Sequence, residues 1–190
     1  MKAIVLVVGL SGAGKSVVAD LIARHGIPKL RLGDEARAET AKRGLAVVTE
    51  NVEATAVAAR RDYGQDIFAR RAMEKAEKLP DPVVCVEGAR DLSEVRLFQR
   101  RSRLLLVVVE APLAVRRARI TARRSAHDPP VTPQEFEVKE ASNERLGIGE
   151  VVKHESPEVK RFVVDNSGTQ EALVREVDRL VKDIKKAAAA

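Results

Sequence analysis

The sequence has little of what builds disulfides, metal clusters or aromatic surfaces. Cys85 is the single cysteine, which excludes an internal disulfide, and its place in the apolar run 83–86 predicts a buried structural thiol. The histidines His25, His127 and His154 show no ligand spacing, so we expect no metal site made of protein side chains alone. Tryptophan is absent and aromatic residues make up 3%, so the core must be mainly aliphatic.

Long hydrophobic runs are also missing. The apolar start, residues 1–10, is too short to span a membrane, and a glycine-rich loop follows it where a secretory leader would have a small-residue cleavage site. We therefore expect a buried strand there, a cytoplasmic protein and no membrane partner. The length of 190 residues, with 45% hydrophobic and 33% charged residues, fits one folded domain over residues 1–190.

Acidic residues are in the minority, with 28 Asp and Glu against 34 Lys and Arg, which gives a formal net charge of +6. A basic balance favours anionic partners, either phosphate-bearing small molecules or nucleic acid. Nucleic-acid binding usually adds aromatic stacking platforms or a reader motif, and one tyrosine with four dispersed phenylalanines does not supply them. Nucleic acid is therefore the minority interpretation.

Short apolar runs alternate with longer amphipathic stretches along the chain. The runs lack polar alternation, which is typical of parallel strands covered on both faces. They occupy residues 3–8, 83–87, 104–110 and 161–164, with a weaker fifth at 28–32. The stretches with helical spacing occupy residues 15–25, 91–101, 113–124 and 168–186. This alternation predicts an α/β fold of three layers, with a five-stranded parallel sheet and helices on both of its faces.

Two connections are longer than a plain crossover between strands. The first, residues 33–79, is charged, has a helical pattern and is broken at Gly44 and Gly64. The second covers about residues 125–160 and contains the sequence DPP at 128–130. Both could be flaps that close over a site, and the alternative is that both are simply long helical connections.

The second connection also contains a helix start. Thr132, Pro133 and Glu135 stand at the N-cap, N1 and N3 positions of a capping box. The helix that they open should end near residues 146–149.

The strongest local signal is the sequence GLSGAGKS at residues 9–16, which matches the pattern G-x-x-x-x-G-K-[ST] between a predicted strand and a predicted helix. Such glycines let backbone amides converge on phosphate oxygens, and the helix start adds partial positive charge. Lys15 would reach the β- and γ-phosphates of ATP and act in catalysis, and Ser16 would ligate Mg²⁺. The expected nucleotide-binding residues of this loop are Gly9, Ser11, Gly12, Ala13, Gly14, Lys15, Ser16 and Val17.

A carboxylate and an arginine follow each of two other predicted strands. Asp34 and Arg37 come after the weaker run, and Glu87 and Arg90 close the run that contains the cysteine. The carboxyl ends of parallel strands lie beside the P-loop, where ligands bind. Arginine forks suit phosphate, and carboxylates can hold Mg²⁺ or accept a proton. We therefore predict substrate binding by Asp34, Arg37 and Arg90. Asp34 and Glu87 are candidate catalytic residues, and Glu87 is also a candidate metal ligand. The alternative is helix-start acids paired with surface arginines.

Arginines are also concentrated at residues 116–124. On a helix, Arg116, Arg119 and Arg123 would share one face. Like charges repel there unless an anion is near, and they would neutralise the charge of a polyphosphate during transfer. A solvated basic face or a nucleic-acid patch would have the same spacing.

Together these residues resemble the adenylate-kinase and dephospho-CoA-kinase branch of P-loop kinases over nearly the whole chain. The sequence GDEAR at 33–37 is similar to the Gly-Asp-x-x-Arg that begins the acceptor segment of that branch. EGAR at 87–90 is a shortened relative of its strand-three ending, with Glu87 in place of the usual Asp, and the spacing from Arg119 to Arg123 is similar to its lid entry.

The resemblance implies roles for residues along the chain. Residues 33–79 would be a helical acceptor-binding insertion and residues 125–160 a short lid. Arg37 and Arg90 would hold the phosphate of the acceptor. Arg119 would stack on the donor base, and Arg123 would contact the donor phosphates and act in catalysis. Asn166 follows the last predicted strand, where the branch brings backbone near the donor base.

A narrower resemblance points to an archaeal family of kinase-like proteins. It is carried by GIGEVV at 147–152, DP at 128–129 and EGARD at 87–91. This family supports the fold more than it identifies a substrate.

Three classes of function are consistent with the sequence. The leading one is an ATP- and Mg²⁺-dependent phosphotransferase that moves the γ-phosphate from a nucleotide donor to a small phosphate-bearing acceptor, such as a nucleoside monophosphate. A hydroxyl acceptor, as in dephospho-CoA, would use a carboxylate base. The others are an ATPase switch with a protein partner and a nucleic-acid kinase or RNA-associated ATPase; the sequence has no Asn-Lys-x-Asp guanine-reading pattern. The oligomeric state is not determined by the sequence.

Overall fold

Five parallel strands form the central sheet of the molecule, in the order β2-β3-β1-β4-β5. The computed structural model describes residues 1–122, 131–145 and 147–189. The strands are β1 (Ala3–Val8), β2 (Lys29–Arg31), β3 (Val83–Glu87), β4 (Arg103–Glu110) and β5 (Lys160–Asp165). In the register of the sheet, Val7 of β1 lies opposite Glu87 on one side and Val107 on the other. The predicted five-stranded parallel sheet is confirmed.

The central strand β1 explains why the strand sequences are continuously apolar. All six of its residues are buried, because successive side chains point to opposite faces of the sheet and both faces are covered. Ile4, Leu6 and Val8 pack in the core on one face, and Val5 and Val7 pack in the core on the other.

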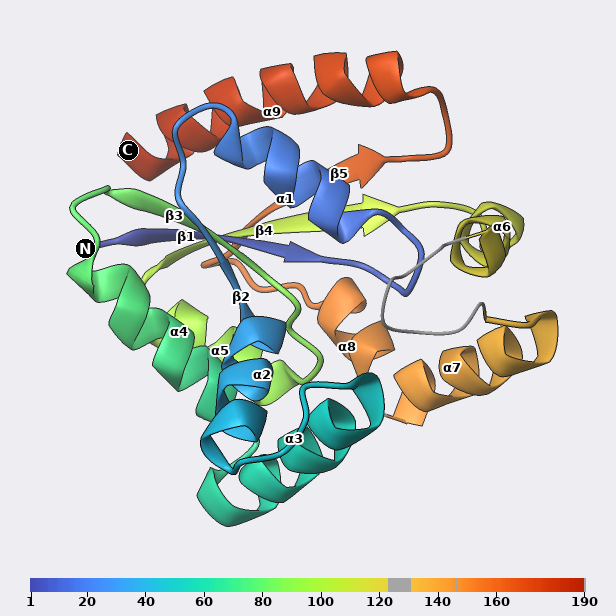
Figure 1. Cartoon of the computed structure of the whole chain (residues 1–190). Helices are drawn as coiled ribbons and strands as arrows, with labels where there is room; N and C mark the ends of the chain where they lie inside the picture. Colours follow the sequence, from blue (N-terminus) through green and yellow to red (C-terminus); the bar gives the residue numbers. More distant parts are fainter. Residues whose placement is uncertain (123–130, 146, 190) are drawn as a thin grey trace.

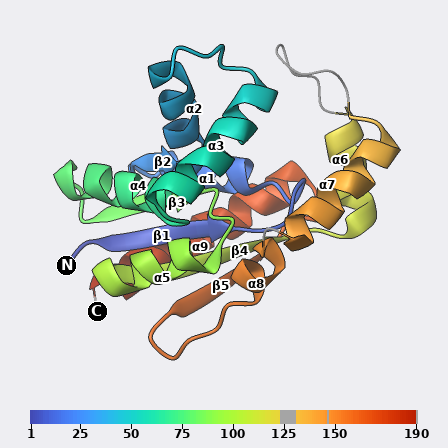
Figure 2. The ribbon, with the colours of Figure 1, turned by 90° about the horizontal axis from the view of Figure 1, so that it is seen from below.

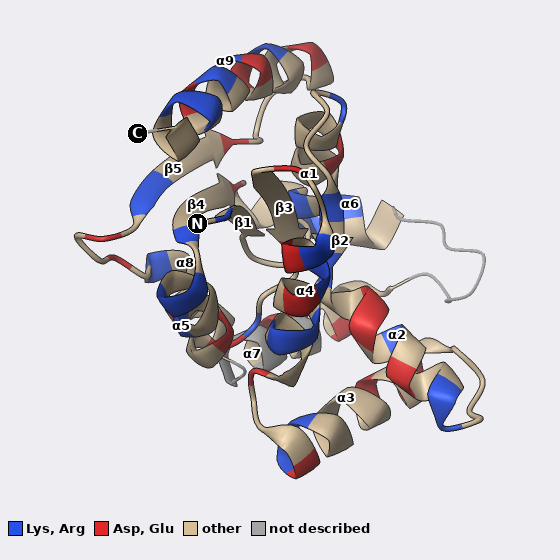
Figure 3. Cartoon of the chain, turned by 90° about the vertical axis from the view of Figure 1, so that its left-hand side faces the viewer, with Lys and Arg blue, Asp and Glu red and all other residues tan. Residues whose placement is uncertain are grey.

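Two helices cover one face of the sheet, α1 (Lys15–Ala23) and α9 (Gln170–Ala189) (Figure 1). The buried stripe of α9 repeats at helical spacing and consists of Leu173, Val177, Leu180, Val181 and Ile184. Lysine and arginine alternate with acidic residues on the rest of α9 (Figure 3), so this surface has charges of both signs.

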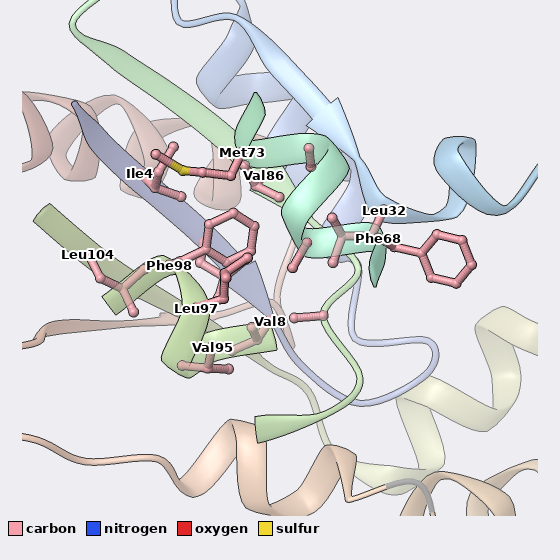
Figure 4. Close-up of a cluster of buried hydrophobic side chains, with 14 of the residues drawn as sticks. Ile4, Val8, Leu32, Phe68, Met73, Val86, Val95, Leu97, Phe98 and Leu104 are labelled. Carbon is pink, nitrogen blue, oxygen red and sulfur yellow. The ribbon is translucent and has the colours of Figure 1, made fainter. Parts of the chain in front are cut away.

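The other face is covered by α4 (Ile67–Lys78), α5 (Leu92–Arg101) and α8 (Ile148–Lys153). Figure 4 shows Met73 of α4 and Phe98 of α5 beside Ile4 of β1, and all three are almost completely buried. The core on this face is mainly aliphatic with two buried phenylalanines, in line with the low aromatic content.

The segment 33–79 contains three helices, with breaks near Gly44 and Gly64 as the glycine pattern predicts. Helices α2 (Leu32–Lys42) and α3 (Thr49–Tyr63) project from the sheet on one side (Figure 2). Two buried carboxylates on α2 tie this projection to α4. Glu39 pairs with Arg71 at 2.9 Å, and Glu35 pairs with Lys75 at 2.6 Å. These charge pairs add to the apolar contacts of Leu32, Ala36 and Ala59 that hold the insertion on the body of the domain.

Helices α6 (Leu113–Ala122) and α7 (Pro133–Arg145) lie beyond the carboxyl ends of the strands (Figure 1). The capping box of α7 is confirmed, since the Thr132 amide donates to Glu135 Oε2 at 2.7 Å and the Glu135 amide donates to Thr132 Oγ1 at 3.2 Å. The helix predicted over 113–124 is described only to Ala122. Arg123 and the DPP sequence at 128–130 lie outside the described residues.

After α7, the structure adds a short helix that sequence reasoning did not separate. Gly147 has φ 77°, a left-handed conformation that suits glycine, and α8 begins directly after it. Its buried residues Ile148 and Val151 bring this segment onto the sheet beside α5.

The described part of the chain contains no helix long and apolar enough to cross a membrane. Cys85 is fully buried in β3, and burial raises the pKa of its thiol to about 12, so the thiol stays protonated. The predicted buried structural cysteine is confirmed.

Candidate functional site

The loop between β1 and α1 has the backbone of a phosphate cradle, with Gly9, Gly12 and Gly14 all at positive φ. A side chain would also collide with neighbouring elements. A Cβ atom at Gly9 would lie 2.4 Å from the carbonyl oxygen of Val109, and one at Gly12 would lie 2.6 Å from that of Arg116. Two of the glycines therefore serve packing against β4 and α6 as well as the course of the loop.

Asn166 follows directly after β5, which is separated from β1 by β4, and it fixes this loop from there. Its Nδ2 atom donates to the carbonyl oxygen of Ala13 at 2.8 Å, and its backbone amide donates to Glu110 at 2.8 Å. A Cβ atom at Gly14 would lie 2.1 Å from Nδ2. Sequence reasoning placed Asn166 near the donor base, and the structure shows a side chain that also shapes the P-loop.

Lys15 points back onto its own loop. Its Nζ atom donates to the carbonyl oxygens of Gly9 at 2.9 Å and Leu10 at 3.1 Å. Burial, together with the positive charge of Arg90, lowers the pKa of Lys15 from its ordinary 10.5 to about 8, against the attraction of Glu87. The predicted residues Lys15, Glu87 and Arg90 are thus close enough to influence one another.

Glu87, at the carboxyl end of β3, has an ion-pair partner that sequence reasoning missed. Its Oε1 atom lies 2.6 Å from Nε of Arg31, the last residue of β2, and not on Arg90, the arginine three residues further along the chain. The Nη2 atom of Arg31 also donates to Oγ of Ser16 at 3.4 Å. One guanidinium therefore touches both residues that were predicted to hold Mg²⁺. Only the register of the sheet reveals this pair, because strands β2 and β3 end side by side with Arg31 opposite Glu87.

The acceptor-side arginines Arg37 and Arg90 are both exposed to solvent. Arg37 pairs with Asp34 at 3.0 Å, and both side chains are more than half exposed. Desolvation of the Arg90 guanidinium lowers its pKa, and the positive charge of Arg60 lowers it as well, against the attraction of Glu53 and Glu94. The structure thus brings Arg60 of α3, which carried no motif, within electrostatic reach of Arg90.

Glu94 of α5 contacts both Arg60 and the backbone of Arg90. It is completely buried, and burial raises its pKa against the opposing effect of Arg60. Its Oε2 atom accepts from the Arg90 amide at 2.7 Å, and its Oε1 atom lies 3.5 Å from Arg60 Nη2. Glu94 therefore connects helix α3 to the turn that carries Arg90.

Of the predicted arginine face on α6, Arg116 already has protein partners. It forms an ion pair with Glu140 of α7, and its Nη1 atom donates to the carbonyl oxygen of Ser11 at 3.2 Å. Arg119 donates from Nη2 to Asn166 Oδ1 at 3.4 Å, and its buried Nη1 has no hydrogen-bond partner in the described part of the chain. Arg116 thus joins the P-loop to α7, whereas Arg119 keeps one N–H group without a partner among the described residues.

A hollow of about 530 Å³ lies beside the P-loop. It is bounded by the P-loop, the ends of β4 and β5, and helices α6 and α8. Its wall is mostly apolar, with Leu10, Ala13, Pro112 and Val152 among the lining residues and Ser167 at one side.

Comparisons with known proteins agree with this geometry. Residues 5–141 match a family model described as an AAA domain. A UPF0200 protein from Thermococcus kodakarensis is 35% identical over 186 residues, which cover 95% of this chain and 97% of the relative. The crystal structure of TT1252 from Thermus thermophilus has a TM-score of 0.63 at 25% identity and matches 96% of this chain and 97% of its own. A gluconokinase from Sinorhizobium meliloti has a TM-score of 0.57 at 19% identity, over 97% and 95% of the two chains. The predicted P-loop kinase-like fold is confirmed.

Proposed function

The chain belongs to the UPF0200 family, and on that premise we propose that it is an ATP- and Mg²⁺-dependent phosphotransferase. Its acceptor would be a small molecule with a phosphate group, of the class of nucleoside monophosphates. The observation that carries the proposal is the meeting of three strand ends. The P-loop lysine after β1 lies within electrostatic reach of the carboxylate and the arginine after β3, and that arginine lies within electrostatic reach of Arg37 after β2.

The donor side would work through backbone amides and one lysine. The loop amides would cradle the phosphates, and Lys15 would leave its two carbonyl partners to follow the charge on the γ-phosphate. The hollow beside the loop would give the nucleoside an apolar wall. The Nη1 atom of Arg119, which has no hydrogen-bond partner among the described residues, would donate a hydrogen bond to the nucleotide. Arg123 lies outside the described residues and stays a prediction from the sequence.

The residues at the loop also suit Mg²⁺, which prefers oxygen ligands. Glu87 offers a carboxylate that is 4% exposed, and Ser16 offers a hydroxyl on the first turn of α1. The Oε1 atom of Glu87 has no hydrogen bond of good geometry within the described residues, so it retains acceptor capacity. When bound, Mg²⁺ would supply positive charge for the phosphates during transfer.

The acceptor side would bind a phosphate through Arg37, Arg60 and Arg90. Arginine is suited to this because its planar fork matches phosphate oxygens. Asp34, Glu53 and Glu94 lie beside these arginines, so an anionic acceptor would compete with carboxylates for the three guanidinium groups. An already anionic acceptor oxygen needs positioning and charge neutralisation more than a base.

One observation favours a second acceptor class. Asp34 is an exposed carboxylate in the first turn of α2, beside Arg37. A hydroxyl acceptor, as in dephospho-CoA-type kinases, would give its proton to such a base. Asp34→Asn would separate the two classes, because it would reduce transfer to a hydroxyl acceptor strongly and transfer to a monophosphate weakly.

An acceptor screen tests the proposal. The protein is incubated with γ-labelled ATP, Mg²⁺ and separate pools of nucleoside monophosphates, dephospho-CoA, sugars and oligonucleotides. We expect label in a phosphate-bearing small molecule, and a loss of about 10²-fold or more in Lys15→Ala. Lys182→Ala, on the exposed side of α9, is the matched control and should transfer normally. Hydrolysis of ATP with no labelled acceptor, accelerated by a protein or RNA, would instead support an ATPase switch.

A further inference from the structure

We propose that Arg31 is a built-in counter-cation of the metal position. In the nucleotide-free protein its guanidinium occupies the space between Glu87 and Ser16, and the divalent cation that arrives with a nucleotide displaces it. The inference rests on the proposed function in one respect, namely that Ser16 and Glu87 hold the metal.

The contacts of Arg31 carry the first step. Its Nε atom lies 2.6 Å from Glu87 Oε1, and its Nη2 atom lies 3.4 Å from Ser16 Oγ. Two oxygens that bind one Mg²⁺ directly stand at most about 4.2 Å apart, because each Mg–O distance is about 2.1 Å. A guanidinium that touches both groups therefore fills the volume that the ion would need.

The burial of Glu87 explains why a cation must be there. Its side chain is only 4% exposed, and a buried carboxylate without a counter-charge is strongly destabilising. Arg31 supplies that charge, yet Oε1 makes no hydrogen bond of good geometry among the described residues. The pairing satisfies the charge of Glu87 without saturating its lone pairs, which is what a replaceable partner would do.

The setting of Arg31 allows it to leave. Its side chain is 42% exposed, and it ends a strand of three residues at the edge of the sheet. The guanidinium can therefore rotate into solvent or onto a phosphate oxygen without disturbing the core.

The surrounding charges decide when the exchange happens. Arg31 pairs with Glu87, and Lys15 interacts with the cations Arg90 and Arg116 and with the carboxylates Glu87 and Glu140, so cations outnumber carboxylates around the metal position. A bare divalent ion would meet net repulsion there, whereas the phosphates of a nucleotide reverse the sign of the local field. Metal and nucleotide should consequently bind together, and Arg31 should oppose binding of the metal when no nucleotide is present.

Binding of Mn²⁺, measured by electron paramagnetic resonance, tests this directly on the full chain. In wild type without nucleotide we expect weak binding, and with ADP tight binding. Arg31→Gln should bind Mn²⁺ without nucleotide at least tenfold more tightly than wild type. Arg31→Lys, which keeps the charge but not the fork, should fall between the two. Arg24→Gln removes an exposed arginine from the end of α1 and should behave like wild type.

Several outcomes would overturn the inference. One is equal Mn²⁺ affinity in wild type and Arg31→Gln when both are folded by circular dichroism. Another is tight binding by nucleotide-free wild type, and a third is a gain in Arg31→Gln that persists when Glu87→Gln is added. If Arg31→Gln does not fold, the inference is overturned when Arg31→Lys binds Mn²⁺ without nucleotide as weakly as wild type does.

The proposed function fails separately. No transfer occurs in the Mn²⁺ measurement, so a protein that shows the expected Mn²⁺ pattern but labels no acceptor contradicts the phosphotransferase and leaves the role of Arg31 standing. Transfer by a protein in which Arg31→Gln leaves Mn²⁺ affinity unchanged contradicts only the role of Arg31.

Discussion

The two halves of the candidate site are built by different forces. The donor half, around the P-loop, is fixed by backbone packing and by the amide of Asn166. The acceptor half, on α2 and α3, is attached to the domain by apolar residues such as Leu32, Ala36 and Ala59 and, in addition, by ion pairs of the buried acids Glu39, Glu35 and Glu94. Backbone contact is indifferent to salt and pH, whereas charge pairs respond to both.

This difference suits a protein with one permanent and one adjustable partner. A cradle formed by close backbone contact presents the same amides in every state. Helices held by charge pairs can shift when an anion competes for the arginines, as a site that closes on an acceptor requires. We therefore expect substitutions in the donor half to act on the whole fold and those in the acceptor half to act locally.

The largest effect should come from Gly12→Ala. The new Cβ atom would lie 2.6 Å from the carbonyl oxygen of Arg116 at a φ of 80°. Left-handed backbone costs a non-glycine residue about 1–2 kcal/mol and overpacking about 1–3 kcal/mol, so the free energy of unfolding should fall by about 2–5 kcal/mol. Urea denaturation measures it.

Gly26→Ala is the matched control for that substitution. Gly26 has nearly the same φ, 81°, but nothing within 4 Å of the added Cβ atom. Only the backbone cost of about 1–2 kcal/mol should appear. Equal losses in the two variants would show that contact with α6 contributes nothing to the loop.

The second effect concerns pH and Lys15. Because its folded pKa is about 8 and its ordinary value 10.5, the folded state binds fewer protons between these pH values. The contribution of Lys15 to the free energy of unfolding should therefore rise by about 3 kcal/mol as the pH increases across that window. Below pH 8 Lys15 is charged in both states, so the full cost of burying its charge lowers stability there. The unfolding free energies of wild type and Lys15→Met, compared from pH 7 to 10, isolate it. A constant difference over that range would contradict the lowered pKa.

These two predictions also show where sequence reasoning was sufficient. The sequence GLSGAGKS is a local motif in which each residue has a position set by its neighbours along the chain, so the loop and Lys15 could be predicted. The five apolar runs likewise predicted the sheet, because each strand carries its own signal.

Arg31 and Arg60 could not be found in the same way. Their partners Glu87 and Glu94 lie on other elements, 56 and 34 residues away along the chain. An isolated arginine in a strand or helix has no local pattern that indicates its partner. Arg116 shows a related limit, since its helical spacing suggested a phosphate ligand but did not indicate its ion pair with Glu140.

In the acceptor half, Glu39→Gln should have the next largest effect. The hydrogen bond from Arg43, with Arg71 close by, lowers the pKa of Glu39. Loss of a hydrogen-bonded buried charge should lower stability by about 1–3 kcal/mol at pH 7. The lowered pKa means that this contribution is present above the ordinary value of 4.5 and is lost as pH falls through the folded value.

Hydrogen exchange locates the effect of Glu39→Gln. We expect faster exchange in α2 and α3 with unchanged exchange in β1 and α1. The control is Glu77→Gln, which breaks an exposed pair with Arg101 and should cost less than about 1 kcal/mol. Acceleration spread evenly over the sheet would contradict a locally attached insertion.

The smallest effect on stability should come from Arg37→Ala. Its pair with Asp34 is more than half exposed on both sides, and such pairs contribute about 0–1 kcal/mol. If Arg37 binds the acceptor phosphate, the same substitution should raise the KM for the acceptor about tenfold or more and leave the affinity for ATP unchanged, because a charge-assisted hydrogen bond contributes about 1.5–3 kcal/mol. Arg61→Ala on the exposed side of α3 is the control, since Arg61 pairs only with its neighbour Asp62 in the described structure. A stable Arg37→Ala that loses ATP binding as well would place Arg37 in the donor half and remove the division between the two halves.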